Sequence, residues 1–275
     1  MDVRDRVAVI TGGGSGIGRA LAQAFSGAGA SHVVVADIDG DAAAEVAQSI
    51  KGTAVELDVA EEAAVVDLVG RVESAHGPIG IFASNAGFVT TGGVEDANER
   101  IQHMWEVHVL SHVYAARAVL PQMIANGGGC LLNTASAAGL LTQIGSMSYS
   151  ITKAAAVSLA EWLSITHRHQ GIHVSVLCPQ AVDTSIVDNS PDAHLLEEDG
   201  LGKGVSSGDG VLDADAVAAA CLDAIRNERF LVLPHPEVAE YALRKATDID
   251  RWLNGMRRFQ HSLFPDGHLP GDALA

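Results

Sequence analysis

Tyr149 and Lys153 lie four residues apart in the stretch SYSITKAAA, within a segment that we expect to be helical. Side chains at this spacing are neighbours on one helix face, so a phenol would lie beside an ammonium group. A nearby cation favours the phenolate and lowers the phenol pKa from about 10 toward neutrality, as general acid–base chemistry requires. Taken alone, the pair is more typical of a surface contact without chemistry.

A glycine-rich loop, TGGGSGIG, runs from Thr11 to Gly18 between an apolar β-branched run and a helical segment. Glycine allows positive φ and lets a ligand approach the backbone, while the helix N-terminus offers unpaired N–H groups. The loop therefore predicts a pyrophosphate site. A P-loop is excluded, because Arg19-Ala20 stands where Lys-Ser/Thr is required. The expected contacts are Gly12, Ser15, Gly16, Ile17 and Gly18.

Asp37 ends the second expected strand, HVVVAD. A carboxylate at this place can accept both hydroxyls of an adenosine ribose and would repel a 2′-phosphate. Neither Ser15 nor Ile38, the nearby positions where a basic residue would receive that phosphate, is charged. Asp37 therefore favours NAD over NADP. The alternative is a strand-end Asp that only faces solvent.

Alternation of short apolar runs with amphipathic stretches must position these groups. The expected strands are 7–11, 32–37, 53–58, 81–85, 130–136, 173–179 and 230–234, and the expected helices are 16–28, 40–50, 61–76, 98–125, 148–169 and 213–227. Strands and helices in this order predict an α/β fold, a parallel sheet of about seven strands with helices on both faces. No repeat or linker divides it.

Composition restricts the class of protein. The 275 residues carry a formal net charge of −17, which argues against binding nucleic acid or an anionic membrane. No apolar run is long enough to cross a bilayer, and the N-terminus lacks a signal-peptide pattern. Cys130, Cys178 and Cys221 form neither a metal-ligand spacing nor a disulfide framework. We expect a cytoplasmic protein without a metal.

Five motifs occur along the chain in a fixed order: Thr11-Gly12-x3-Gly16-x-Gly18, Asp58-Val59, Asn85-Ala86-Gly87, Ser136 and Tyr149-x3-Lys153. Together they resemble the short-chain dehydrogenase/reductase family, closely over about residues 3–184 and loosely to about 234. The resemblance implies a Rossmann-like, doubly wound single domain over 1–234, NAD(P)(H) as hydride carrier, and very often a homotetramer.

The resemblance also implies roles for the residues of the opening pair. Tyr149 would be the general acid/base that exchanges a proton with the oxygen of an alcohol or ketone. Lys153 would hold the nicotinamide ribose, and Ser136 would hydrogen-bond the same substrate oxygen and stabilise charge that develops there. An NAD-dependent oxidoreductase of secondary alcohols and ketones is therefore expected.

Further cofactor contacts follow from the same resemblance. Asp58 would meet the adenine amino group beside the Val59 backbone, and Asn85, Ala86 and Gly87 would line the adenine-ribose side. Thr184 and the Val182 backbone would contact the nicotinamide carboxamide, and Pro179 lies near the nicotinamide. Capping of a strand end is the alternative reading for each.

Two positions depart from the family pattern. His108 stands where the family usually has an asparagine whose backbone holds a water in a proton relay behind the lysine. An imidazole that titrates near pH 6.5 would weaken that relay or make it pH-dependent; if only the backbone matters, His108 keeps it. Gln180 replaces the usual glycine after Pro179 and either helps to define the substrate or faces solvent.

The substrate side is less well defined. Residues 183–210 are polar and acidic, and we interpret them as a lid or a tolerated surface insertion. Leu140, Leu141, Ile144 and Met147, between Ser136 and Tyr149, favour a hydrophobic alcohol or ketone. The extension 235–275, with aromatic residues, would cover the pocket or pack at a subunit interface. The alternative function is an NAD(H)-binding sensor or scaffold protein with little turnover; a methyltransferase would not need Tyr149 and Lys153.

Overall fold

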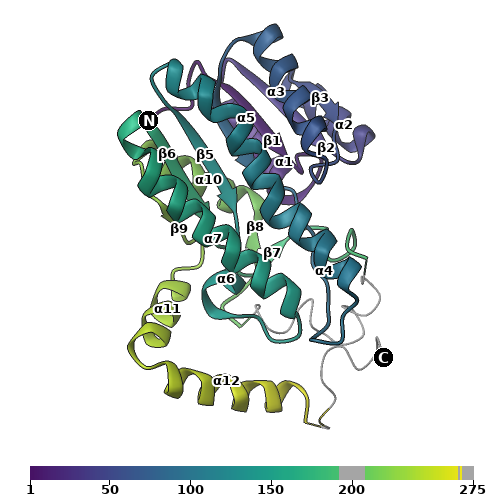
Figure 1. Ribbon diagram of the computed structural model, residues 1–275, viewed down its shortest axis with the longest axis vertical. Helices are drawn as coiled ribbons and strands as arrows, with labels where there is room; N and C mark the ends of the chain where they lie inside the picture. Colours follow the sequence, from purple (N-terminus) through teal and green to yellow (C-terminus); the bar gives the residue numbers. More distant parts are fainter. Residues whose placement is uncertain (192–207, 266, 268–275) are drawn as a thin grey trace.

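The computed structural model describes residues 1–191, 208–265 and 267. Seven strands form a parallel sheet in the order β3-β2-β1-β4-β5-β6-β9 (Figure 1). They are β1 (Val7–Thr11), β2 (His32–Asp37), β3 (Thr53–Glu56), β4 (Ile79–Ser84), β5 (Gly129–Thr134), β6 (Ile172–Leu177) and β9 (Leu231–Val232). The prediction of a doubly wound α/β fold with about seven parallel strands is confirmed.

Helices cover both faces of this sheet (Figure 1). One face packs against α3 (Glu62–His76), α5 (Ser111–Ala125) and α7 (Met147–His167), and the other against α1 (Gly16–Gly27), α2 (Gly40–Ile50) and α10 (Ala214–Arg226). The central strands are therefore buried on both sides. This is why they read as continuous apolar runs and not as alternating patterns.

The strand order reverses at β1, which lies between β2 and β4. Val9 of β1 pairs with Val34 on one side and with Phe82 on the other. The chain leaves β1 toward α1 on one face, whereas it leaves β4 toward α5 on the opposite face. Diverging connections of this kind open a crevice at the carboxyl ends of the strands, where open α/β sheets bind ligands.

The helix expected over 98–125 is not continuous. It consists of α4 (Asn98–Trp105), a π-helical segment η1 (Glu106–Leu110) and α5. The amide of Ser111 donates to the carbonyl of Glu106, the wider i to i+5 pattern. Periodicity of apolar residues does not reveal one inserted residue, so the interruption was missed. Such π segments are frequent at functional sites, and this one carries His108.

Several shorter elements also differ from the expectation. The expected helix 148–169 begins at Met147 and ends at His167, followed by the 3₁₀ turn η2 (Arg168–Gln170). Strands β7 (Val182–Asp183) and β8 (Leu212–Asp213) form a separate parallel pair, which joins the two ends of the expected lid. Residues 192–207 of that lid lie outside the described residues.

The C-terminal extension forms α11 (Glu237–Thr247) and α12 (Ile249–Leu263). Val238 of α11 is fully buried against Ala137 and Leu141 of α6 (Ala137–Leu141), a short helix that the sequence did not predict. From α11 the chain turns, and α12 runs beneath α6 (Figure 1). The extension therefore packs on its own chain. Within the described part of the chain, none of the helices has both the length and the apolar character needed to span a bilayer.

Candidate active site

The loop between β1 and α1 approaches its own helix too closely for a side chain. Gly12 adopts φ of +63°, in the left-handed region. A Cβ on Gly18 would lie 1.9 Å from the Gly12 carbonyl oxygen. Helix α1 begins at Gly16, and the preceding Ser15 makes no capping hydrogen bond. First-turn amides such as that of Ile17 have no partner within the helix, so the cradle fits a pyrophosphate.

The variant Gly18→Ala should lose this cradle. The added methyl group collides with the Gly12 carbonyl, so the loop must open and its amides turn away. We expect the Kd for NADH, measured by fluorescence titration, to rise more than about tenfold. Gly27→Ala is the matched control on the same helix, because a Cβ there meets nothing within 4 Å. Equal affinity of both variants and the parent protein would show that the loop does not hold the cofactor.

Asp37 lies over the glycine loop at the end of β2. Its Oδ2 accepts a hydrogen bond from the Gly14 amide at 2.8 Å, and its Oδ1 accepts one from the Asp39 amide at 3.1 Å. These two bonds fix the carboxylate next to the cradle. The carboxylate oxygens retain acceptor capacity after these bonds, so Asp37 fits the ribose hydroxyls that were predicted for it.

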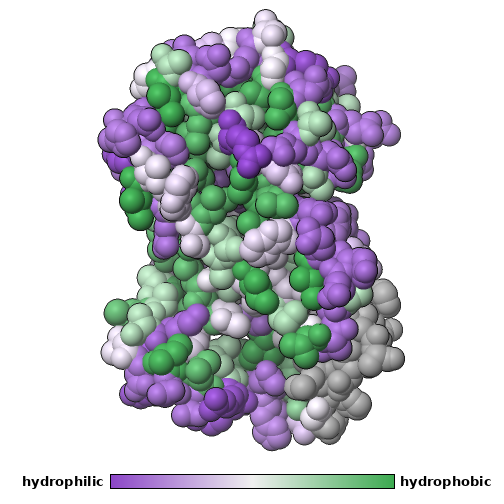
Figure 2. Space-filling view, in the orientation of Figure 1, coloured by the Kyte–Doolittle hydropathy of each residue, from purple (hydrophilic) through white to green (hydrophobic). Residues whose placement is uncertain are grey.

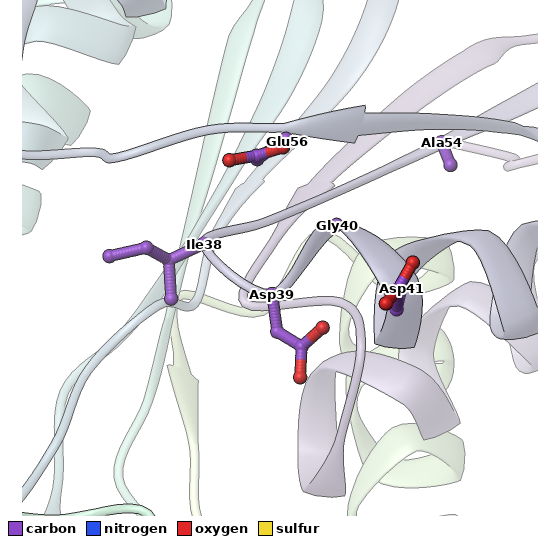
Figure 3. A pocket seen from close by; sticks show the side chains of 6 residues that line it. All are labelled: Ile38, Asp39, Gly40, Asp41, Ala54 and Glu56. Carbon is purple, nitrogen blue, oxygen red and sulfur yellow. The ribbon is translucent and has the colours of Figure 1, made fainter.

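An acidic cavity of about 450 Å³ flanks this strand end. Asp39 and Asp41 lie at the beginning of α2, and Glu56 lies across from them at the end of β3 (Figure 3). Ile38, 71% exposed, projects away from these carboxylates beside the cavity (Figure 3). Together with Asp37, these groups make the surroundings of this strand end strongly negative.

Asn85 serves mainly as a brace. Its Nδ2 donates to the carbonyls of Thr11 and Gly12 at 3.2 and 3.3 Å, and its Oδ1 accepts from Thr134 at 3.0 Å. The side chain therefore ties the ends of β1, β4 and β5 together and is committed to the protein. Ala86 also donates its amide to Thr11 Oγ1, at 3.2 Å. The backbone amide of Asn85 donates to the same oxygen at 3.0 Å, so both amides are also used within the protein.

The other expected cofactor residues lie around the same crevice. A Cβ on Gly16 would lie 3.0 Å from the Thr184 side chain, so Thr184 contacts the glycine loop, and its hydroxyl donates to Val182. Asp58 accepts from the Ala60 amide at 2.9 Å and lies beyond β3, which ends earlier than predicted. Its neighbour Val59 is buried in the core. The carbonyl of Pro179 accepts the Ala137 amide.

Ser136, Tyr149 and Lys153 come together at the carboxyl end of β5. Ser136 caps α6, and its side chain hydrogen-bonds Tyr149. Lys153 lies one turn after Tyr149 on α7, with its Nζ 5.5 Å from the phenol ring centre. That Nζ donates to the Thr134 carbonyl at 3.1 Å. The structure thus brings the three expected catalytic side chains into one buried cluster.

The pKa of Tyr149 departs from the expectation. Burial raises the pKa of the phenol above its usual value, while the hydrogen bond from Ser136 opposes that rise. Burial also lowers the pKa of Lys153 to about 8. The net pKa of the phenol is therefore raised and not lowered as expected, because the desolvation of Tyr149 has the largest effect on it.

His108 is a neutral side chain that links two segments through hydrogen bonds. Its Nε2 accepts the Phe88 amide at 3.2 Å, so the ring proton lies on Nδ1, 3.0 Å from Thr152 Oγ1. Thr152 in turn donates to the carbonyl of Ser148. Burial, with Lys153 nearby, holds the pKa of His108 well below its usual range. The expectation that this imidazole titrates near pH 6.5 is wrong, because its surroundings penalise the charged form.

The absence of a side chain at Gly87 leaves space for the side chains of His108 and Lys153. A Cβ at Gly87 would lie 3.1 Å from His108 Nε2 and 3.5 Å from Lys153 Nζ. The structure therefore places Gly87 beside the lysine and the histidine, whereas the sequence placed it on the adenine-ribose side. The edge of the His108 ring also meets the Tyr149 ring, at 5.6 Å between centres.

An apolar cluster adjoins the phenol on the substrate side. Tyr149 packs with Val89, Met104 and Ala138, and Phe264, which directly follows α12, packs against them. Covering the pocket was one of the two expected roles of the extension and its aromatic residues, Trp252, Phe259 and Phe264. A four-residue repeat in the tail, Trp252, Met256, Gln260 and Phe264, was the signal that one helix face points inward.

In the residues that the structure describes, no group of three or more His, Cys, Asp or Glu side chains is placed to hold a metal ion. His112 is buried on α5, and burial lowers its pKa to about 3. Gln180 donates its amide to Nδ1 of the buried His235 at 3.2 Å, so its backbone is fixed by the extension.

Comparison with known proteins gives consistent matches. The family described as short chain dehydrogenase matches residues 6–194. The 1-deoxy-11-beta-hydroxypentalenate dehydrogenase of Streptomyces exfoliatus is 35% identical, over 92% of this chain and 90% of that protein. A short chain dehydrogenase/reductase from Burkholderia phymatum, solved with NAD, has a TM-score of 0.83 at 30% identity and covers 91% of this chain and 96% of its own. L-sorbose reductase from Gluconobacter frateurii, solved with NADPH and L-sorbose, has a TM-score of 0.75 at 27% identity, over 85% of this chain and 95% of its own.

A glycine cradle at the switch point of a doubly wound sheet, beside a buried Ser–Tyr–Lys cluster, defines a dinucleotide-dependent oxidoreductase. The family match over residues 6–194 and the 35% identity to the Streptomyces exfoliatus dehydrogenase show that the chain belongs to the short-chain dehydrogenase/reductase family. Members of this family bind NAD(P), and the relatives above are dehydrogenases and reductases. The chain is therefore an oxidoreductase that acts on alcohol or ketone groups.

Proposed function

We propose that this protein interconverts a secondary alcohol and its ketone with NAD(H), using Tyr149 as general acid/base. The observation that carries the proposal is the buried cluster in which Ser136 hydrogen-bonds Tyr149 and Lys153 lies one turn below. The nicotinamide, when bound, accepts or supplies the hydride. The residues of the chain have to hold the substrate oxygen and move its proton.

Each side chain of the cluster has a separate task in this proposal. Tyr149 gives a proton to the ketone oxygen in reduction and takes it from the alcohol in oxidation. The Ser136 hydroxyl donates to the same oxygen as negative charge develops on it. Lys153, held by the Thr134 carbonyl, places a positive charge near the phenol while it is deprotonated. His108 holds the Phe88 segment and α7 in register and does not itself transfer a proton.

NAD, and not NADP, is the proposed cofactor. The support is the fixed carboxylate of Asp37 over the loop, with Asp39, Asp41 and Glu56 around it. The 2′-phosphate of NADP would enter a region of like charge, which costs binding free energy. The adenine-ribose site is proposed to include Asp58, Val59 and the backbone of Asn85 and Ala86, and the nicotinamide site Pro179, Val182 and Thr184.

The variant Asp37→Ser should relax this preference. Loss of the carboxylate removes the ribose acceptor and the repulsion of the 2′-phosphate together. We expect the ratio of kcat/KM for NAD over NADP to fall by about 10- to 100-fold, in steady-state assays with both cofactors. Asp41→Asn is the matched control, since it removes one nearby charge without touching the loop and should change the ratio less than threefold. A ratio that Asp37→Ser leaves unchanged would contradict the assignment.

A hydrophobic substrate fits the surroundings of Tyr149. Val89, Met104 and Ala138 bury their side chains next to the phenol, and Phe264 completes the apolar wall. A polar substrate would lose hydrogen bonds to water there without replacement. Part of the wall comes from the extension 235–265, so we propose that the extension belongs to the substrate site and the segment 1–234 to the cofactor and catalytic domain.

The proposal is tested by a panel of secondary alcohols of increasing size, each with NAD, followed through NADH formation. Turnover that rises with apolar size, and that is much lower with NADP, is the expected result. If NADH binds tightly while no alcohol or ketone in the panel is turned over, the alternative of an NAD(H)-binding sensor or scaffold protein is favoured. A panel of matching ketones with NADH covers the reductive direction.

We also propose a homotetramer in a reducing cytoplasm. Trp162 and Ile165 on α7 are 57% and 82% exposed, an apolar face that a second copy would cover. Cys130, Cys178 and Cys221 are free and buried, and burial raises the pKa of each to about 12. Such thiols are unreactive packing groups, as expected where disulfides are not used. Light scattering gives the assembly state directly.

A further inference from the structure

A groove separates α12 from the segment that joins Ser136 to Tyr149. It has a volume of about 480 Å³ and is lined by residues 141–147 on one side and by α12 on the other. In the space-filling view, apolar residues gather around a hollow between α12 and the body of the molecule (Figure 2). The groove is distinct from the cofactor crevice, because neither the glycine loop nor Asp37 contributes to it.

The walls of the groove are apolar. Leu141, Ile144 and Met147 face Trp252 and Met256 across it. A volume of this size accommodates a small ligand or a large part of one, and apolar walls favour a hydrocarbon body. Such walls left facing water would cost free energy, which argues for an occupant.

The charges on the groove have one sign. Lys245 and Arg257 line it, whereas its described lining residues include no Asp or Glu, although the chain as a whole carries a net charge of −17. Lys245 donates to the Leu140 carbonyl at 2.7 Å, and Arg257 donates through one nitrogen to Asn254 at 2.8 Å. An ammonium and a guanidinium have more donors than these single bonds use, so both retain N–H groups for an anion.

A buried hydroxyl adds a second polar feature. Ser146 lines the groove, is 3% exposed, and its Oγ has no hydrogen-bond partner among the described residues. A buried hydroxyl without a partner costs free energy.

One face of α12 connects the groove to the catalytic cluster. Trp252, Met256 and Gln260 line the groove, and Phe264, four residues further, packs on the cluster that contains Tyr149. At a rise of 1.5 Å per residue, Met256 and Phe264 lie about 12 Å apart along the helix. If the reacting group of a ligand lies at Tyr149, the far end of that ligand, about 12 Å away, would reach Lys245 and Arg257.

We propose that this groove binds the distal end of the substrate, and that the substrate is an apolar molecule carrying a carboxylate. The carboxylate lies at Arg257 and Lys245, and the hydrocarbon body lies along α12 toward the phenol. This inference rests on the proposed function for the position of the reacting hydroxyl. Arg257 is its specificity-determining residue, since the guanidinium can bind a carboxylate through two parallel hydrogen bonds.

Calorimetric titration with decanoate, without any cofactor, tests the groove directly. We expect decanoate to bind, and its uncharged analogue decanamide to bind at least tenfold more weakly. Arg257→Met should raise the Kd of decanoate about 10- to 100-fold and leave decanamide unaffected, because only the charged hydrogen bond is lost. Arg258→Met is the matched control, an exposed arginine on the same helix outside the groove lining, and should stay within twofold.

Two results would overturn the proposal. One is the absence of decanoate binding, and the other is a Kd that Arg257→Met leaves unchanged. If decanoate does not bind and an oligomer dissociates in Met256→Gln, the groove is assigned to contact with a second copy of the chain. Decanoate carries no hydroxyl, so its binding does not depend on turnover. Arg257-dependent binding with no turnover in either panel would refute the reaction and reassign the groove to a ligand that is not a substrate.

Discussion

Tyr149→Phe is expected to reduce kcat by about 10²- to 10⁴-fold in both directions, the usual contribution of a positioned acid or base. The change removes one oxygen and keeps the ring that packs against Val89, Met104 and Ala138. The hydrogen bond with Ser136 is lost, so that serine alone would hold the substrate oxygen. Residual turnover in the variant would come from positioning and from Ser136.

The cofactor affinity distinguishes this loss from damage to the fold. The Kd of NADH should change less than about threefold in Tyr149→Phe, because the glycine loop, Asp37 and Lys153 are unaltered. Tyr114→Phe is the control for loss of a phenol elsewhere, since Tyr114 lies on α5, packed against the core. A Tyr149→Phe protein that retains more than about a tenth of the parent kcat would remove the phenol from the proposed mechanism.

The cofactor side of the site follows from local sequence to a large extent. A run such as VAVIT followed by glycines determines both a buried strand and the loop after it, because each rests on a few adjacent residues. Asp37 ends β2 as predicted, and it meets the Gly14 amide of the loop because parallel strands end at a common edge. The family match adds independent support for this half of the chain.

Contacts between distant segments were less predictable. The side chain of Asn85 is a brace between β1, β4 and β5, and no spacing along the chain shows that its donors meet Thr11 and Gly12. The neutral state of His108 has the same origin: complete burial and two hydrogen bonds, from Phe88 and to Thr152, come from two different segments. A reference pKa near 6.5 therefore misled the prediction.

The C-terminal extension shows that an apolar pattern in the sequence does not identify the surface against which a helix packs. The stripe from Trp252 to Phe264 predicts an amphipathic helix, but the sequence does not say which surface that helix covers. The structure identifies this surface. Val238 is buried against α6, and this contact directs α11 and then α12 toward the segment before Tyr149. Substrate recognition in this protein is thus proposed to depend on the packing of a segment far along the chain from the catalytic pair. The contact of Lys245 with the Leu140 carbonyl, across 105 residues of sequence, illustrates this.

Lys153 links activity to pH through a charge that the fold disfavours. Burial lowers its pKa to about 8, from the usual 10.5. Below pH 8 the group is charged in both the folded and the unfolded chain, so its desolvation destabilises the folded state. Between about pH 8 and 10.5 the folded protein has released this proton while the unfolded chain keeps it, so the contribution of Lys153 to the free energy of unfolding rises with pH over that interval.

The rate of ketone reduction should move in the opposite direction. Below pH 8, Lys153 is charged and Tyr149 carries the proton it must donate, because burial also raises the phenol pKa. Above pH 8 the ammonium loses its charge and the phenolate that forms loses its support, so kcat/KM, which reports the groups of the free enzyme, should fall along a limb with a midpoint near 8. Stability measured at each pH separates this limb from alkaline unfolding, because the three buried thiols, whose pKa is raised from 9.0 to about 12, lower the free energy of unfolding at higher pH.

Lys153→Met is expected to lower kcat for reduction by about 10²- to 10³-fold and to abolish the limb near pH 8, in profiles recorded from pH 6 to 10. The same variant should be more stable at pH 7 by up to about 3 kcal/mol, since the buried charge is gone; denaturant unfolding measures this gain. His108→Asn is the control for the neighbouring imidazole, whose pKa lies well below this range, and should leave the midpoint in place. A midpoint that moves in His108→Asn, or a limb that persists in Lys153→Met, would assign the titration to another group. Activity and stability shifting in opposite directions in one variant identify Lys153 as a residue that the fold retains for its charge.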